Sequence, residues 1–235
     1  MTMNAIEGQG GRPEICTTRD YFEPARESIF ALMRRDIERH VKMDGRDGGL
    51  SARLRVLADA PGLQAVLIHR LGAWMTRLAP WPLQFPVKIV HFFLHKLCII
   101  CWGIHIDNHA RIGGGLHIVH FGGIVIGAVR MGSDCSIMQN VTVGRRAGGE
   151  GVPVLGDRVS IATGSVVYGD IQIGDGVSIG PLTVVSRSLP PRVLVMGNPM
   201  RVIKRDYDNS IEIYGVPADV QLNGEGETQS EQESR

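Results

Sequence analysis

A six-residue apolar repeat runs through the second half of the chain and constrains its fold more than any other feature. Thirteen apolar residues lie on this ladder, in three runs separated by one inserted residue and one doubled step. The ladder residues are Ile106, Ile112, Ile118, Ile124, Met131, Ile137, Val143, Leu155, Ile161, Val167, Ile173, Ile179 and Val185. Six is neither the helical period of about 3.6 nor the strand period of about 2, so the repeat belongs to the tertiary structure.

The repeat predicts a left-handed parallel β-helix. One ladder side chain per hexad points into a narrow shaft, and glycine and small residues form the corners, where the backbone needs unusual φ or has no room for Cβ. Three hexads make one coil, so residues 106–185 predict between four and five stacked coils. The ladder residues are then core, and none of them is catalytic.

The first part of the chain carries helical signals instead. Apolar residues share one helical face after Pro24, a glycine-rich turn follows at 44–49, and two or three further helices are expected between 50 and 79. Pro80, Pro82 and Pro86 are expected to break the chain before an apolar helix at 87–102. The fold class is thus a helical domain followed by an all-β solenoid.

We expect four segments along the chain. They are a disordered N-terminus at 1–19, a helical domain at 20–102, a β-helix domain at 103–205 and a mostly disordered, acidic tail at 206–235.

Composition excludes several classes of partner and location. The net charge is +1 with 21% charged residues, so no basic excess points to nucleic acid. The apolar stretch 87–104 is interrupted by Lys88, His91, His95 and Lys96, whereas a membrane span needs about 18 or more largely uncharged residues. We expect a helix packed on other helices, with contact to a membrane surface left open. The N-terminus has no charged-then-apolar signal sequence, so a cytoplasmic location is expected.

Chemistry is predicted at two places on the solenoid. The doubled step at 144–154 cannot stay in a coil, and we expect a loop expelled from the prism. His120 follows ladder residue Ile118 near a corner, and His105 and Asp107 precede it by about one coil. Residues one coil apart stack in space, so His120 is a candidate base that either neighbour could orient. The alternative interpretation is a set of surface histidines.

A metal site is the competing chemistry for clustered histidines. His105, His117 and His120 could together hold a metal across two barrels, as in a γ-carbonic-anhydrase-like enzyme. No second histidine pair lies further along the β-helix, so we expect no metal.

Three segments resemble the serine acetyltransferase branch of the hexapeptide-repeat acyltransferases. They are Ile106–Gly127, Ser136–Gly144 and the exit motif Gly197–Arg201, and Arg46-Asp47 and Pro61–Arg70 fit the family's helical domain. The resemblance covers about 35–205 and implies an acetyl-CoA-dependent O-acetyltransferase, similar to enzymes that convert L-serine to O-acetylserine for cysteine synthesis.

The resemblance also assigns roles. His120 matches the family's catalytic base, which takes the proton of the acceptor hydroxyl. Asp47 matches an acidic residue that holds the acceptor's amino group. Thr163, Gly180 and Pro181 match turns along which CoA lies.

The sequence departs from the family pattern around the acceptor. The family's orienting aspartate aligns with His105, although Asp107 is close. An acidic residue before the base is Val119 here, and the Arg-His pair that grips the serine carboxylate aligns with Gly151-Val152. Arg145 and Arg146, earlier in the expelled loop, are candidates to replace that pair. The acceptor is therefore L-serine or a sugar hydroxyl of a capsule or exopolysaccharide, and a non-catalytic scaffold is the remaining alternative.

The flat faces predict a homotrimer with active sites between barrels, or a dimer of such trimers. The family's cysteine synthase docking uses a terminal isoleucine. This sequence ends in Ser-Arg, so docking is not expected.

Overall fold

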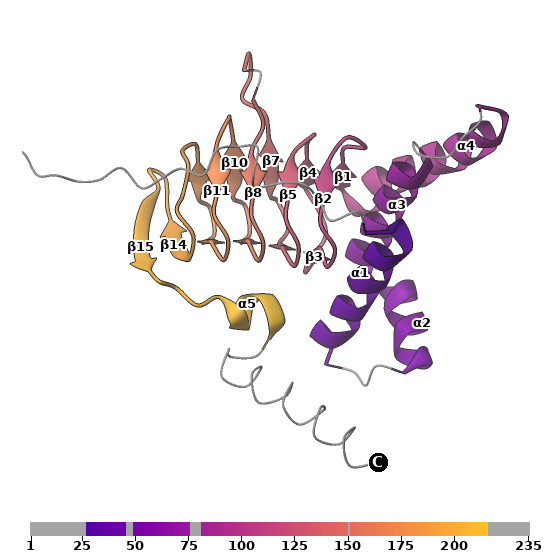
Figure 1. Ribbon diagram of the computed structural model, residues 1–235, viewed down its shortest axis with the longest axis horizontal. Helices are drawn as coiled ribbons and strands as arrows, with labels where there is room; N and C mark the ends of the chain where they lie inside the picture. The colour runs from indigo at the N-terminus through magenta and orange to yellow at the C-terminus, as the bar shows by residue number, and fades with distance from the viewer. Residues whose placement is uncertain (1–26, 46–48, 76–80, 150, 216–235) are drawn as a thin grey trace, which may run out of the picture.

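The computed structural model describes residues 27–45, 49–75, 81–149 and 151–215, and these form a helical domain stacked on one end of a β-helix (Figure 1). The expected disordered N-terminus, 1–19, lies outside the described residues. The helices are α1 (Ile29–Met43), α2 (Leu50–Asp59), α3 (Pro61–Met75) and α4 (Trp81–Leu97), and α4 continues as a π-helical turn, η1 (Cys98–Trp102).

The helix boundaries follow local chemistry. Ser28 caps α1, because its side chain accepts a hydrogen bond from the backbone N–H of Ala31. Pro61 begins α3, where a missing N–H costs nothing. The expected proline break before 87 is wrong, because α4 starts at Trp81 and carries Pro86 inside it. Pro82 lies in the first turn, where backbone N–H groups have no helical partner.

Short strands wind into three parallel sheets, as the six-residue ladder predicts. The first sheet has the order β1-β4-β7-β10-β13, the second β11-β8-β5-β2 and the third β15-β14-β12-β9-β6-β3. The first consists of β1 (Ile104–Ile106), β4 (Ile124–Ile126), β7 (Thr142–Gly144), β10 (Val166–Tyr168) and β13 (Val184–Val185). The second consists of β2 (Arg111–Ile112), β5 (Arg130–Met131), β8 (Val154–Leu155) and β11 (Gln172–Ile173). The third consists of β3 (His117–Ile118), β6 (Ser136–Ile137), β9 (Ser160–Ile161), β12 (Ser178–Ile179), β14 (Val193–Met196) and the antiparallel β15 (Arg201–Arg205).

The core confirms the assignment of the ladder. All thirteen ladder side chains are buried, none more than 7% exposed, and they form one cluster with neighbouring apolar residues. The register stacks rung on rung, as with Ile118 beside Ile137 and Ile137 beside Ile161. The chain is a left-handed β-helix of hexapeptide repeats preceded by helices.

Two arginines join the helical domain to the first coils. Arg70 of α3 pairs with the buried Asp36 of α1 and donates to the carbonyl of Gly113. Arg39 of α1 donates to the carbonyl of Cys135 and to the hydroxyl of Ser136. Because these donors meet backbone carbonyls at coil corners, they fix the helices against the end of the solenoid.

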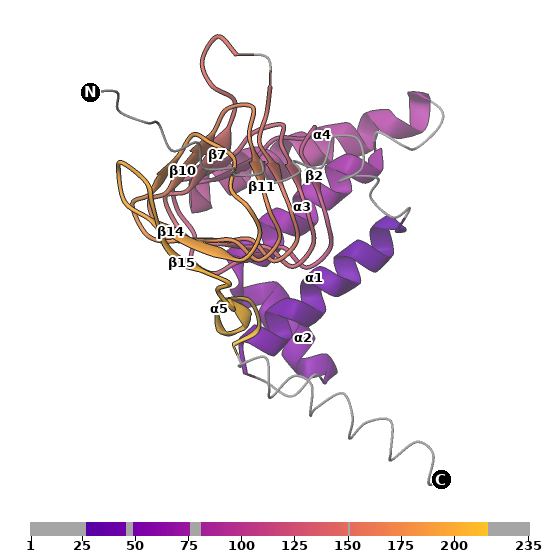
Figure 2. The same cartoon turned by 60° about the vertical axis from the view of Figure 1, so that its left-hand side comes forward.

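The segment predicted to be mostly disordered, 206–235, begins with ten described residues. Residues 206–215 are described, and they include a short helix, α5 (Ser210–Tyr214), which lies beside the third sheet and α1 (Figure 2). Ile213 is fully buried, its carbonyl accepts from Arg39, and Glu212 accepts from the hydroxyl of Ser178. Residues 216–235 lie outside the described residues.

Candidate active site

The predicted base, His120, lies in the turn that links β3 of the third sheet to β4 of the first sheet. This turn stacks on the equivalent turn of the next coil, because the N–H of Asn140 donates to the carbonyl of Gly122. Gly123 has φ +65°, and a Cβ there would collide with the Asn140 side chain, so the turn needs glycine. His120 itself is exposed at this corner.

The residues predicted to contact CoA occupy the same corner in later coils. Thr163 follows β9, and Gly180 and Pro181 follow β12, so all three lie in turns that lead from the third sheet to the first. The turns are in register, since the N–H of Leu182 donates to the carbonyl of Thr163 over 2.9 Å. His120 and the three CoA candidates therefore line one continuous edge of the prism, which we call the His120 edge.

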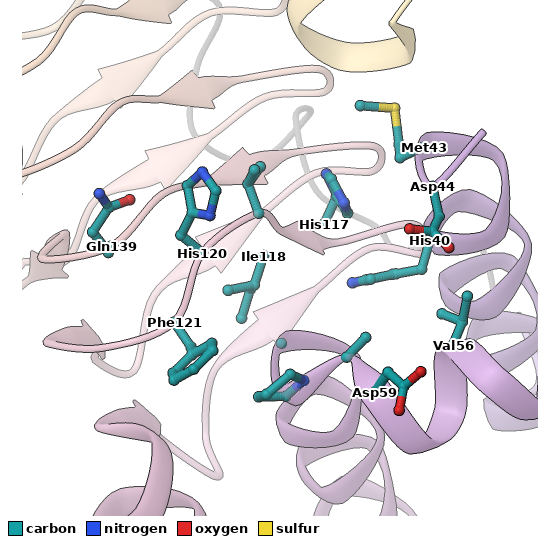
Figure 3. Close-up of a pocket in the computed structure, with 14 residues that line it drawn as sticks. His40, Met43, Asp44, Val56, Asp59, His117, Ile118, His120, Phe121 and Gln139 are labelled. Carbon is teal, nitrogen blue, oxygen red and sulfur yellow. The ribbon is translucent and has the colours of Figure 1, made fainter.

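A cavity of about 640 Å³ opens beside His120, between the turn after β3 and the helical domain (Figure 3). Strand β3 contributes His117, the turn after it contributes His120 and Phe121, and the next coil contributes Gln139. The helical side is formed by the end of α1, the end of α2 and the start of α3. Its lining residues there are His40, Met43, Asp44, Val56, Asp59, Ala60, Pro61 and Gly62. A cavity of this size is typical of small-molecule sites.

Two buried histidines form the wall between the helices and β3. The rings of His40 and His117 meet edge to face with centroids 4.7 Å apart. Burial lowers the pKa of His40 to about 4 and that of His117 to about 3, so both imidazoles are neutral at pH 7. The sequence did not single out His40. A polar residue on a helix is normally expected on the exposed face, and its ring partner, His117, lies far away along the chain.

The structure does not join the two predicted orienting residues to His120. Asp107 accepts hydrogen bonds from the N–H of His109 at 2.7 Å and from its ring Nδ1 at 3.0 Å. The ring of His105 lies 5.3 Å from that of His95 on α4. Among the described residues, neither has a hydrogen bond or ring contact with His120. His105 and Asp107 precede His120 by about one coil. They lie in and just after β1 of the first sheet, whereas His120 lies in the turn that leads into this sheet.

Two of the three residues predicted to bind the acceptor, Arg145 and Arg146, lie away from this cavity. Arg145 and Arg146 are exposed in the loop between β7 and β8, at the corner between the first and second sheets. Figure 1 shows this loop projecting on the opposite side of the prism from β3. Asp47 lies outside the described residues. The cavity lining holds two other carboxylates, Asp44 and Asp59, which the sequence analysis did not single out.

The described part of the chain contains no group of three or more His, Cys, Asp or Glu side chains arranged to hold a metal ion. His117 and His120 share the cavity, but His105 packs against α4. The three histidines required by the metalloenzyme alternative are thus not gathered within one chain.

Comparisons with known proteins agree with this architecture. The family described as bacterial transferase hexapeptide (six repeats) matches residues 153–187. The coils and their corner site define a hexapeptide-repeat transferase.

Curated relatives give the narrower assignment. The serine acetyltransferase of Synechococcus elongatus is 36% identical over 163 residues, which are 68% of this chain and 64% of the relative. That of Mycobacterium tuberculosis is 35% identical over 161 residues, 67% of each chain. That of Escherichia coli K12 is 30% identical over 63% of this chain and 53% of the relative. The chain belongs to the serine acetyltransferase family, although it spans only about half to two thirds of the length of these relatives.

Two solved structures of similar fold are complexes with ligands. Soybean serine acetyltransferase complexed with serine has a TM-score of 0.62 at 28% identity, covering 75% of this chain and 70% of that one. Serine acetyltransferase from Brucella abortus in complex with coenzyme A has a TM-score of 0.62 at 28% identity, covering 74% and 67%.

Proposed function

We propose that this protein is an acetyl-CoA-dependent O-acetyltransferase whose acceptor is L-serine. The family assignment supports the reaction, and the coenzyme A and serine complexes of its structural neighbours support the two substrates. The observation that carries the proposal is the His120 edge. It puts the candidate base and the candidate CoA turns on one line, beside a cavity large enough for an acceptor.

In the proposed reaction, His120 accepts the proton of the acceptor hydroxyl. The hydroxyl oxygen forms a bond to the thioester carbonyl carbon, and the carbon–sulfur bond then breaks. The proton held by His120 passes to the departing thiolate, so the products are the O-acetyl ester and free CoA. A base placed in this way contributes about 10²–10⁴ to the rate.

The proposal includes a homotrimer, with a dimer of trimers as the larger alternative. His120 and the Arg145–Arg146 loop occupy different corners of one prism, so they can act on the same acceptor only if a neighbouring chain brings its loop to the His120 edge. The chemistry needs no metal. The proposal also includes a cytoplasmic location.

A second acceptor class, a sugar hydroxyl, is favoured by the charge of the cavity. Among the described residues, none of the fourteen that line the cavity is a lysine or arginine, whereas the carboxylate of serine needs a cationic partner. In this alternative, Asp59 accepts hydrogen bonds from the sugar hydroxyl groups, and the exposed Phe121 packs against one face of the sugar ring.

The experiment is a thiol-release assay with acetyl-CoA and either L-serine or nucleotide sugars and oligosaccharides. We expect turnover with L-serine, and His120→Ala should lower kcat by about 10²–10⁴ while acetyl-CoA binding is retained. Turnover with sugars alone would move the acceptor to the second class. No turnover with any hydroxyl acceptor, in a protein that binds acetyl-CoA, would refute the proposed reaction.

A further inference from the structure

Helix α4 and the π-helical turn that follows it leave an apolar face uncovered. The stretch Phe85–Trp102 has a mean hydropathy of 1.5 over 18 residues, and only 11% of it is buried. By length and composition alone it could cross a membrane. Seven of its large apolar side chains are at least 43% exposed, namely Phe85, Ile89, Val90, Phe92, Phe93, Leu97 and Ile100. A helix packed in a soluble core would bury these residues.

The face of α4 that meets the protein carries both of its histidines. His91 is buried against α3, where Gly72 makes room for it, because a Cβ at Gly72 would lie 2.5 Å from His91 Nε2. His91 lies near the backbone of Ile68 and His95 near that of Ile106, and the His95 ring lies 5.3 Å from the His105 ring. The usual arrangement of an amphipathic helix on a soluble protein is therefore inverted, with histidines inward and phenylalanines outward.

These inward contacts are incompatible with a membrane-spanning helix. A spanning α4 would have to leave α3 and β1 and take Lys88, His91, His95 and Lys96 into the hydrocarbon, which costs about 2.5–3.5 kcal/mol for a central lysine alone. A helix that lies flat in the headgroup region keeps its histidines on the protein and buries only its outer face.

The charges on α4 identify the kind of surface that fits it. Residues 81–102 contain no Asp or Glu, and the lysines Lys88 and Lys96 are both exposed. The Lys96 ammonium lies 5.8 Å from the centroid of the Phe92 ring, so a cation borders the apolar face. Long basic side chains at such a border reach phosphate groups while the adjacent aromatic rings enter the acyl region. Figures 1 and 2 both show α4 projecting from the body of the molecule, where a flat surface can reach it.

We propose that α4 and η1 bind the surface of a bilayer that contains anionic phospholipid, with the Phe85–Ile100 face buried and the two lysines on the headgroups. This attachment is separate from the acetyl-transfer site and does not depend on the identity of the acceptor.

The test is co-sedimentation of the full chain with vesicles of phosphatidylcholine alone or of equal parts phosphatidylcholine and phosphatidylglycerol. We expect binding to the mixed vesicles and weak binding to phosphatidylcholine. The double variant Phe92→Ser/Phe93→Ser should bind the mixed vesicles at least about tenfold more weakly. Lys88→Gln and Lys96→Gln should each weaken it about fivefold, and only when phosphatidylglycerol is present.

Ile203→Ser is the matched control, because Ile203 is 56% exposed on β15, away from α4, and its loss should leave vesicle binding unchanged. Circular dichroism and the thermal midpoint establish that each variant is folded. Two results would overturn the proposal. One is equal or absent vesicle binding by folded wild type and α4 variants. The other combines two observations: the wild type binds no vesicles, and the phenylalanine variant has a lower oligomer mass by light scattering. That result would show that the apolar face binds a second copy of the chain.

Discussion

Asp36 on α1 and Arg70 on α3 form a fully buried ion pair, with Arg70 Nε 3.0 Å from Asp36 Oδ2. The other oxygen of the same carboxylate accepts hydrogen bonds from the backbone N–H groups of Gly115 and Leu116, at 2.7 and 3.1 Å. One side chain thus holds two helices and a coil corner together. That corner leads directly into β3 and the turn that carries His120.

Removing this carboxylate should destabilise the whole molecule. Asp36→Ala leaves Arg70 as a buried, unpaired charge, and we expect the free energy of unfolding to fall by about 3–5 kcal/mol. Urea denaturation at neutral pH measures the change. Glu38→Ala is the control, because its pairing with Arg34 lies on the exposed surface and should be worth less than about 1 kcal/mol. Equal losses for the two variants would show that the buried pair has no special role.

Gly62, the second residue of α3, should report on the contact between the helical domain and the site. A Cβ there would lie 2.5 Å from the carbonyl oxygen of Ile118 and 2.7 Å from its Cβ. Gly62→Ala should therefore push α3 away from β3, lower the free energy of unfolding by about 1–3 kcal/mol and reduce kcat. Gly49→Ala provides the comparison, because its nearest neighbour would be Ser51 Oγ at 3.9 Å. Unfolding and turnover of Gly62→Ala that match those of Gly49→Ala would contradict the expectation.

Acidification should destabilise the protein through its buried histidines. Burial, and secondarily the charge of Arg70, lower the pKa of His69 to about 3. In the unfolded chain, His69 has a pKa of about 6.5 and is protonated below that pH, whereas in the folded chain it stays neutral down to about pH 3. The free energy of unfolding should then fall with pH below about 6.5, by up to about 1.4 kcal/mol per pH unit for this residue. His40 and His117 add to the same trend.

Urea midpoints measured between about pH 7 and about pH 5 test this dependence. His69→Gln should make the pH slope of stability shallower. Ile68→Val changes a neighbouring side chain without a titrating group, so it should change the stability but keep the slope. A His69→Gln slope as steep as that of the wild type would rule out His69 as a source.

The His120 edge makes a prediction about CoA. Thr163→Glu puts a carboxylate among the turns proposed to hold CoA, and we expect its repulsion of the CoA phosphates to raise the Kd at least about tenfold. Gln172→Glu makes the same change in charge on β11 of the second sheet, away from that edge, and should leave the Kd unchanged. Isothermal titration calorimetry with CoA gives both values. A Kd for Thr163→Glu equal to the wild-type value would place CoA somewhere else on the prism.

The sequence predicts the solenoid well, because each rung follows from local spacing alone. Ile118, Ile137 and Ile161 stack because each occupies the same place in its hexad, and their turns place Thr163 and Pro181 on the corner of His120. The contacts between the helical domain and the β-helix do not follow from any local spacing in the sequence. Asp36 finds Gly115 and Leu116 across 79 and 80 positions, and nothing in a helical pattern distinguishes that carboxylate from a solvated one.

Two further misses have specific causes. The three prolines around α4 suggested a break, but Pro82 lies in the first turn, where its missing N–H is not needed. Nothing in the sequence indicated the short helix α5, because the Ile213 carbonyl and Glu212 bind Arg39 of α1 and Ser178 of β12, which lie far away along the chain. Asp107 was a reasonable partner for His120 by coil arithmetic. Within one chain its carboxylate accepts two hydrogen bonds from its neighbour His109, and its role toward His120 stays a prediction.

The hydrogen bond from Arg39 to the carbonyl of Ile213 spans 174 positions of the chain. A stack of coils is in principle a one-dimensional array whose ends can fray separately. Here α5 returns from the last coil to the first helix, so the two ends of the array are tied to each other. Opening the C-terminal coil therefore also breaks a contact of the N-terminal domain, and we expect the two ends of the array to unfold together.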